Sequence, residues 1–184
     1  MRLFVAIDLP EDVRRALTVT VDELRRTVRG PSWARVEGLH LTLKFIGEVE
    51  EDRVGAVLRA LQSVRAPAPF DLRYAGTGFF PDAKAPRVFW AGMETPPELA
   101  ALAAAVESCL EPLGIPRERR AFHPHLTLAR LKSHDPVDAL RTAAAGLAVA
   151  EFGTGRVEEF HLYQSVLKPA GAEYTRMAAF ALGA

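Results

Sequence analysis

The tetrapeptide His40-Leu41-Thr42-Leu43 occurs a second time in this chain as His125-Leu126-Thr127-Leu128. Both copies lie in stretches where polar and apolar residues alternate, which is the pattern of a β-strand. Residues two apart in a strand point to the same face, so each histidine shares a face with its threonine. The leucines then pack on the opposite face. The repeat therefore predicts two similar strands that each present a His-x-Thr pair.

Helical patterns flank both motif strands, which we expect near residues 39–46 and 122–131. Apolar residues recur at helical spacing over residues 11–29, and similar patterns follow the first motif and surround the second. The matching order of helix, motif strand and helix indicates an internal duplication. We therefore predict an α+β fold for residues 1–184, as a single bilobal domain. Its two pseudo-symmetric lobes would carry antiparallel sheets that face a central cleft, with helices on the outside.

The bulk composition fits one compact domain and argues against a protein that coats long nucleic acids. The chain has 184 residues, and 49% of them are hydrophobic. Lys plus Arg and Asp plus Glu both number 23, which gives a formal net charge of +0. Proteins that bind long stretches of nucleic acid are usually basic. The balance leaves room for an enzyme that grips one or two phosphates.

The single cysteine, Cys109, allows no intrachain disulfide and fits a reducing compartment. The apolar run in the opening MRLFVAIDLP is too short for a signal peptide, and Asp8 interrupts it. No apolar stretch approaches the roughly 20 residues that span a bilayer. We expect a cytoplasmic monomer with no membrane partner.

Two His-x-Thr pairs suit acid–base chemistry on a phosphodiester. Histidine titrates near neutral pH, so one imidazole can accept a proton from water while another donates one to the leaving oxygen. Each threonine hydroxyl can donate a hydrogen bond to a non-bridging oxygen. The candidate catalytic residues are His40 and His125, with Thr42 and Thr127 as phosphate-binding residues. This scheme requires no metal and no cofactor. A single motif of this kind is also what any half-exposed strand looks like, and the duplication is what favours a functional site.

The chain resembles the two-histidine phosphoesterase superfamily in four segments that span nearly its whole length. Within that superfamily it looks like the bacterial and archaeal RNA 2′,3′-cyclic phosphodiesterases, first named 2′-5′ RNA ligases. The matching segments are RLFVAIDLPEDVR at 2–14, LHLTLKFIGEV at 39–49, FHPHLTLAR at 122–130 and LYQSVLKPAGAEYT at 162–175.

The resemblance implies hydrolysis of an RNA-terminal 2′,3′-cyclic phosphate to a 2′-phosphomonoester. It also implies a weak, reversible 2′-5′ ligation of RNA ends such as tRNA fragments. A 2′-phosphate product requires the 3′ oxygen to leave. We prefer His40 as the proton donor to that oxygen and His125 as the proton acceptor from water, although the near-symmetric repeat leaves the reverse assignment open. The resemblance also makes Arg130 a phosphate-binding residue.

Four further residues are candidates for the rim of the site or for its phosphate contacts. Alternation places Lys44 on the His40 face, where it could attract RNA phosphate or simply be solvated. Alternation also places Phe45 on the core side, although the resemblance allows it near the pocket. Arg130 falls on the face opposite His125 unless a bulge re-aims it. His123 either shapes the pocket or, with His125, forms part of a zinc site.

Other functions use the same residues. The four motif side chains would serve equally for hydrolysis of small cyclic phosphates or of 2′-5′ oligonucleotides. A non-catalytic module that binds RNA ends is a second alternative, and a metallohydrolase is a third.

Overall fold

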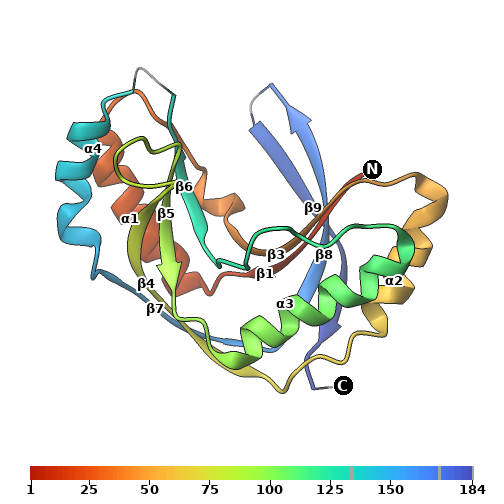
Figure 1. The fold of residues 1–184 in the computed structure, drawn as a ribbon. Helices are drawn as coiled ribbons and strands as arrows, with labels where there is room; N and C mark the ends of the chain where they lie inside the picture. Colours follow the sequence, from red (N-terminus) through yellow and green to blue (C-terminus); the bar gives the residue numbers. More distant parts are fainter. Residues whose placement is uncertain (133–134, 170, 184) are drawn as a thin grey trace.

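Two antiparallel β-sheets and four α-helices make up the described part of the chain (Figure 1). The structure is a computed structural model that describes residues 1–132, 135–169 and 171–183. Each sheet is covered by its own pair of helices, and the sheets diverge from the middle of the molecule (Figure 1). The predicted α+β fold with two antiparallel sheets and outer helices is confirmed.

The first sheet carries the first motif. Its strand order is β3-β1-β8-β9, and every neighbouring pair is antiparallel. The strands are β1 (Arg2–Asp8), β3 (His40–Glu48), β8 (Glu159–Lys168) and β9 (Gly171–Ala181).

The second sheet carries the second motif. Its strand order is β2-β6-β5-β4-β7, again antiparallel throughout. The strands are β2 (Ser32–Trp33), β4 (Phe70–Phe80), β5 (Val88–Met93), β6 (Leu126–Arg130) and β7 (Glu151–Val157).

Each sheet combines strands from both halves of the sequence. The C-terminal strands β8 and β9 extend the sheet of the first motif, and the early strand β2 pairs with the second motif strand β6. The two lobes of the fold are therefore not the two halves of the chain, although the motifs themselves are duplicated.

Four helices cover the outer faces of the sheets. α2 and α3 pack on each other and against strands of the first sheet, whereas α1 packs on β7 and α4 beside the second sheet. Their bounds are α1 (Glu11–Thr27), α2 (Val54–Gln62), α3 (Pro97–Leu110) and α4 (Val137–Ala144); short 3-10 helices are η1 (Val36–Gly38), η2 (Glu51–Arg53), η3 (Glu111–Leu113) and η4 (Ala145–Leu147). Among the described residues, no helix is long and apolar enough to cross a membrane.

Helix α1 shows why these segments fold locally and how the first motif is held. Its buried residues recur three or four apart and form one apolar stripe: Val13, Leu17, Val21 and Leu24. Arg14, on another side of the helix, donates hydrogen bonds of 2.8 Å to the carbonyl oxygens of Val36 and Glu37. These bonds fix η1, which leads directly into His40.

The two motif strands differ in length. The first, β3, matches the prediction closely, whereas β6 begins only at Leu126 rather than near residue 122. Pro124 has no backbone N–H for a strand ladder, which explains the late start. His125 therefore lies in the segment immediately before its strand. All four motif leucines are buried as predicted, at 0–4% exposure for Leu41, Leu43, Leu126 and Leu128.

Candidate active site

His40 is partly buried among aromatic rings of the first sheet. Its ring stacks on Phe4 at a centroid distance of 4.5 Å and meets the edge of Tyr174 at 4.9 Å. Tyr163 stacks on Phe4 at 5.4 Å and on His40 itself at 6.1 Å. These contacts restrict rotation of the imidazole ring and shield part of it from solvent.

His125 occupies a corresponding aromatic setting in the second sheet. Phe80 meets its ring edge-on at 4.9 Å and also meets His123 at 5.1 Å. Trp90 lies against both Phe80 and His123. His123 is exposed and its ring contacts that of Phe80, and its position at the rim of the site stays a prediction.

Both imidazoles are held by the same hydrogen bond. His40 Nδ1 lies 2.9 Å from the carbonyl oxygen of Gly38, and His125 Nδ1 lies 2.8 Å from that of His123. The acceptor is two residues earlier in each case. A carbonyl only accepts, so Nδ1 carries the proton and donates it. Each Nε2 is then left with a lone pair when the ring is neutral, ready to exchange protons with a substrate.

Burial lowers the pKa of both histidines below the usual 6.5, and the surrounding charges differ between them. After burial, the Gly38 carbonyl and the Asp8 carboxylate raise the pKa of His40, and Arg14 lowers it. For His125, the carbonyl of His123 raises the pKa, whereas the His123 ring and Arg130 lower it. His40 thus has a carboxylate and a guanidinium nearby, whereas His125 has a guanidinium and a second imidazole nearby.

A β-bulge at Leu43 overturns the predicted facing of the next two residues. Val5 pairs with Lys44 but the next residue, Ala6, pairs with Thr42, so Leu43 has no partner. Leu43 and Lys44 are consequently both buried, and Phe45 is 55% exposed. The prediction that Lys44 shares the His40 face is wrong, and so is the prediction that Phe45 faces the core. An extra residue in one strand reverses the alternation beyond it.

Lys44 forms a buried ion pair instead of facing the site. Its side chain is 2% exposed, and its Nζ lies 2.7 Å from Glu107 Oε1 of α3. The same Nζ donates a 2.6 Å hydrogen bond to the carbonyl oxygen of Pro116. Glu118 lies further away, at 3.8 Å. Lys44 therefore ties the first motif strand to the segment that leads to the second motif.

A second bulge, at the same position of the other motif, turns Arg130 toward His125. Phe89 pairs with Ala129 and the following Trp90 pairs with Thr127, so Leu128 is skipped. Leu128 and Ala129 are both buried and Arg130 is exposed. Simple alternation is wrong for Arg130, and the bulge restores it to the Thr127 face. Burial is the main cause that lowers the pKa of His125, and the charge of Arg130 lowers it further.

Thr42 and Thr127 are partly exposed on the same strand faces as their histidines. Within residues 1–132, 135–169 and 171–183, neither hydroxyl is engaged by another protein group. Both are therefore free to donate to a ligand.

The zinc alternative needs a third ligand beside His123 and His125. No group of three or more His, Cys, Asp or Glu side chains suited to a metal occurs among the residues that the structure describes.

The sequence reasoning did not single out Asp8, which lies beside His40. Asp8 is the cross-strand neighbour of His40 and accepts a 2.6 Å hydrogen bond from the hydroxyl of Tyr163. His161, which is 2% exposed, lies 3.6 Å from Asp8. Asp8 and Tyr163 occur in the segments that carry the family resemblance, which is the one signal that could have pointed to them.

Two contacts connect the motif strands across the junction of the sheets. The backbone N–H of Ala34 donates to the carbonyl oxygen of Leu128 at 2.8 Å, and residues 35–39, which include η1, separate Ala34 from His40. Lys44 binds Pro116 at 2.6 Å in the segment that leads to His125. In the sequence, each histidine therefore lies between two residues that contact the sheet or the segment of the other motif.

A fold of two facing antiparallel sheets that carry paired His-x-Thr motifs defines the two-histidine phosphoesterases. The family model described as the 2′-5′ RNA ligase superfamily matches residues 10–168. The chain belongs to this superfamily.

Similar proteins of known name match the chain along nearly its full length. A protein of Archaeoglobus fulgidus named RNA 2′,3′-cyclic phosphodiesterase is 36% identical over 182 residues, 98% of this chain and 99% of the relative. The crystal structure of TT0787 of Thermus thermophilus superposes with a TM-score of 0.83 at 37% identity, covering 99% of this chain and 98% of that one. The structure of E. coli LigT complexed with 3′-AMP gives a TM-score of 0.77 at 30% identity, covering 100% of this chain and 98% of LigT.

Proposed function

We propose that the chain hydrolyses 2′,3′-cyclic phosphates at RNA ends and leaves a 2′-phosphomonoester, with His40 and His125 as the catalytic pair. The observation that carries the proposal is the equivalent setting of the two imidazoles. Each donates through Nδ1 to a carbonyl two residues earlier, and the threonine two residues after each has a hydroxyl that no group in the described part of the chain engages. The Archaeoglobus relative, named for this activity, supports the substrate class.

The reaction needs one proton taken and one proton given. His125 Nε2 accepts a proton from water as the water oxygen attacks phosphorus. The bond between phosphorus and the 3′ oxygen breaks, and His40 donates the proton on its Nε2 to that oxygen. The products are a 2′-phosphate and a 3′-hydroxyl. Proton exchange with solvent returns both imidazoles to their starting states.

The surrounding charges support this division of roles. The acid must be protonated before the reaction, and the carboxylate of Asp8 favours the imidazolium form of His40. The base must be neutral, and Arg130 and His123 disfavour the imidazolium form of His125. The substrate phosphate adds negative charge near both rings when it binds, which makes protonation of His40 easier.

Negative charge builds on the non-bridging oxygens as water attacks. Thr42 and Thr127 supply neutral hydrogen-bond donors for these oxygens, and Arg130 supplies a positive charge from the second sheet. Donors placed in advance where charge develops lower the barrier without reorganisation during the step. Weak 2′-5′ ligation follows from the same arrangement when the 5′-hydroxyl of a second RNA replaces water.

The test is incubation with an oligoribonucleotide that ends in a 2′,3′-cyclic phosphate, in EDTA, followed by identification of the product. We expect a 2′-phosphate and a bell-shaped pH profile whose two limbs reflect the histidine pair. His40→Ala and His125→Ala should each lower turnover by about 10²-fold or more. Retained binding without any turnover by the wild-type protein would favour the non-catalytic module. Loss of activity in EDTA would favour the metallohydrolase.

A further inference from the structure

A pocket of about 500 Å³ lies between β3 and the segment 115–120, beside the His40 side of the candidate site. Phe45 forms part of its lining, and its ring lies 6.0 Å from Phe4, which stacks on His40. The volume is within the range of about 300–1,000 Å³ that is typical of ligand pockets. The pocket is therefore separated from His40 by only two ring contacts.

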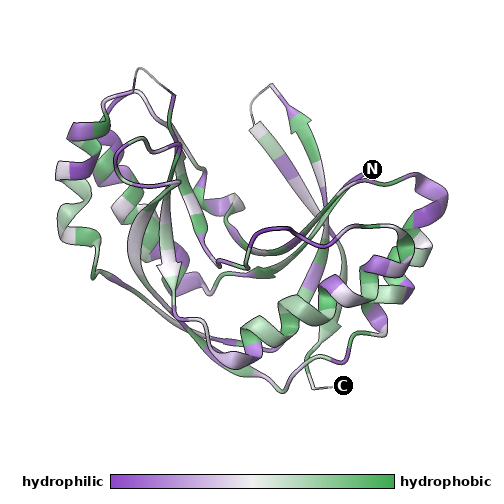
Figure 2. Ribbon diagram, viewed as in Figure 1, coloured by the Kyte–Doolittle hydropathy of each residue, from purple (hydrophilic) through white to green (hydrophobic). Residues whose placement is uncertain are grey.

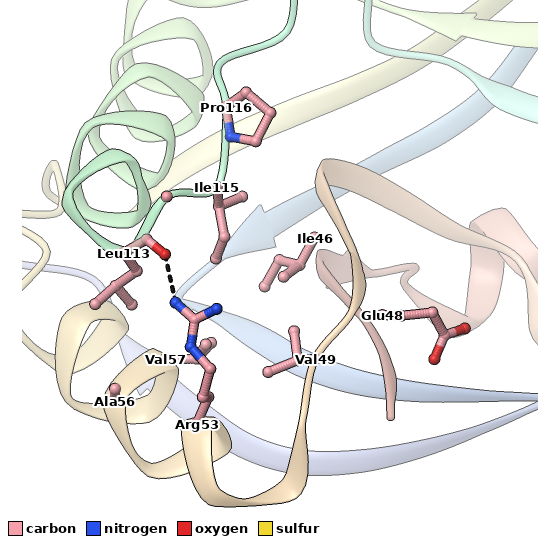
Figure 3. Close-up of a pocket in the computed structure, with 10 residues that line it drawn as sticks. Ile46, Glu48, Val49, Arg53, Ala56, Val57, Leu113, Ile115 and Pro116 are labelled. Atoms are coloured by element: carbon pink, nitrogen blue, oxygen red, sulfur yellow. Dashed lines mark hydrogen bonds between the residues drawn. The ribbon is translucent and has the colours of Figure 1, made fainter.

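The segment that forms the outer wall of this pocket is fixed to the first sheet and its helices. Arg53 donates to the carbonyl oxygen of Leu113 at 2.6 Å, in a smaller neighbouring pocket (Figure 3). Lys44 binds the carbonyl oxygen of Pro116, and the backbone N–H of Glu118 donates to Glu107 Oε2 at 3.0 Å. The wall itself is therefore held to β3 at Pro116 and to α3 at Glu118.

The arginines of this wall fall into two groups. Arg117 is engaged, because it donates to Glu111 at 2.8 Å and to Ser108 at 2.9 Å. Arg119 and Arg120 line the pocket and are exposed, and within the described ranges no carboxylate pairs with either. Their only acidic neighbour in the lining is Glu118.

The position of these charges is informative because the chain as a whole is neutral. Its formal net charge is +0, so a positive surface has to be local. Figure 2 shows the segment between η3 and β6 as a largely hydrophilic run that crosses the middle of the molecule. Two exposed guanidinium groups beside an exposed phenyl ring and a pocket suit a phosphodiester backbone.

We propose that the pocket between β3 and residues 115–120 binds the RNA strand on the 5′ side of the reacting nucleotide, with Arg119 and Arg120 on its backbone phosphates. The inference rests on the proposed function, because that function supplies the RNA strand. Its consequence is a preference for oligonucleotides over mononucleotides that end in the same cyclic phosphate. Small cyclic phosphates then become poorer substrates that use the four motif side chains alone.

The test compares 2′,3′-cyclic AMP with a hexaribonucleotide that ends in a 2′,3′-cyclic phosphate. The variant is Arg119→Ala/Arg120→Ala, and the matched control is Arg59→Ala/Arg65→Ala, which removes the same charge from exposed positions outside the pocket. At 50 mM salt we expect kcat/KM for the hexanucleotide to fall about tenfold in the pocket variant alone. The value for 2′,3′-cyclic AMP should not change in either variant.

Salt dependence provides an independent readout. Two phosphate contacts on a single strand correspond to a slope of about −1.4 in log affinity against log salt. Raising the salt from 50 to 200 mM should therefore lower the wild-type kcat/KM for the hexanucleotide about sevenfold more than it lowers the kcat/KM of the pocket variant. Equal losses on both substrates, or no loss on the hexanucleotide, would overturn the inference.

Affinity distinguishes failure of this inference from failure of the proposed function. Fluorescence anisotropy with the hexanucleotide 3′-phosphate, which cannot react, requires no turnover. If the pocket variant binds the hexanucleotide about tenfold more weakly than the wild-type protein, the pocket is supported as the RNA-binding site even if no substrate is hydrolysed. If the affinity is unchanged in the pocket variant, the pocket is rejected as the RNA-binding site even if hydrolysis is confirmed.

Discussion

Replacing Lys44 by methionine tests its structural role against the phosphate contact that was one of the two alternatives in the sequence analysis. The ammonium group is 2% exposed and lies 2.7 Å from Glu107 and 2.6 Å from the carbonyl oxygen of Pro116. Lys44→Met leaves the Glu107 carboxylate, itself only 14% exposed, without its cation. Removing one partner of a buried pair costs about 3–5 kcal/mol. Because Glu118 N–H still binds Glu107, we expect the lower end, about 3 kcal/mol.

Thermal unfolding measures this loss directly. For a chain of this length each kcal/mol corresponds to about 2–4 °C in Tm, so Lys44→Met should lower Tm by about 6–12 °C. The double variant Lys44→Met/Glu107→Met should lose less than the sum of the single variants, because no charge is left unpaired. Below the melting range, KM for 2′,3′-cyclic AMP should match wild type. An unchanged Tm with a raised KM would refute the buried anchor and restore Lys44 as a phosphate contact.

Three further predictions concern charges around the histidines. Because burial lowers both pKa values, His40 and His125 should titrate below 6.5 by NMR. Inorganic phosphate should raise both midpoints and bind more tightly as pH falls, since an anion favours the imidazolium form; midpoints above 6.5 in the free protein would contradict this. Arg130→Ala should lower kcat/KM about 10–100-fold and raise the pKa of His125, whereas a role confined to surface ion pairing would leave both unchanged. Asp8→Asn should lower the pKa of His40 and leave that of His125 in place, and equal shifts in both rings would count against the assignment of roles.

Local alternation was sufficient for the core of each motif but not for the residues after it. It correctly placed the motif leucines inside and the His-x-Thr pairs on the other face. It failed directly after Leu43 and Leu128, because one extra residue at each position reverses the facing of the side chains that follow it. In the second motif the adjacent apolar pair Leu128-Ala129 was a usable signal. In the first motif, the residue buried next to Leu43 is Lys44. Because lysine is charged, the sequence shows no adjacent apolar pair that would indicate the bulge.

The neighbours of His40 could not be read from local pattern. Asp8 lies beside His40 because β1 pairs with β3, and Tyr163 reaches Asp8 because β8 pairs with the other edge of β1. Strand order is a tertiary property, and the β8 residues come more than a hundred positions later in the chain. Periodicity gives the faces of single strands, whereas the order of strands decides which faces meet.

The two bulges also explain how a duplicated motif can serve an asymmetric substrate. Phe45 and Arg130 occupy the same position relative to their histidines, and the bulges turn both outward. One motif thus offers an aromatic ring and the other a positive charge. A 2′,3′-cyclic phosphate presents two chemically similar ester oxygens, and a fully symmetric pair of imidazoles would not distinguish them. Both proton-transfer groups are imidazoles, because the proposed reaction needs one group that accepts a proton and one that donates a proton. In the proposed mechanism, Asp8 near His40 and Arg130 near His125 set the direction of proton transfer, so the asymmetry resides in the neighbours rather than in the two histidines.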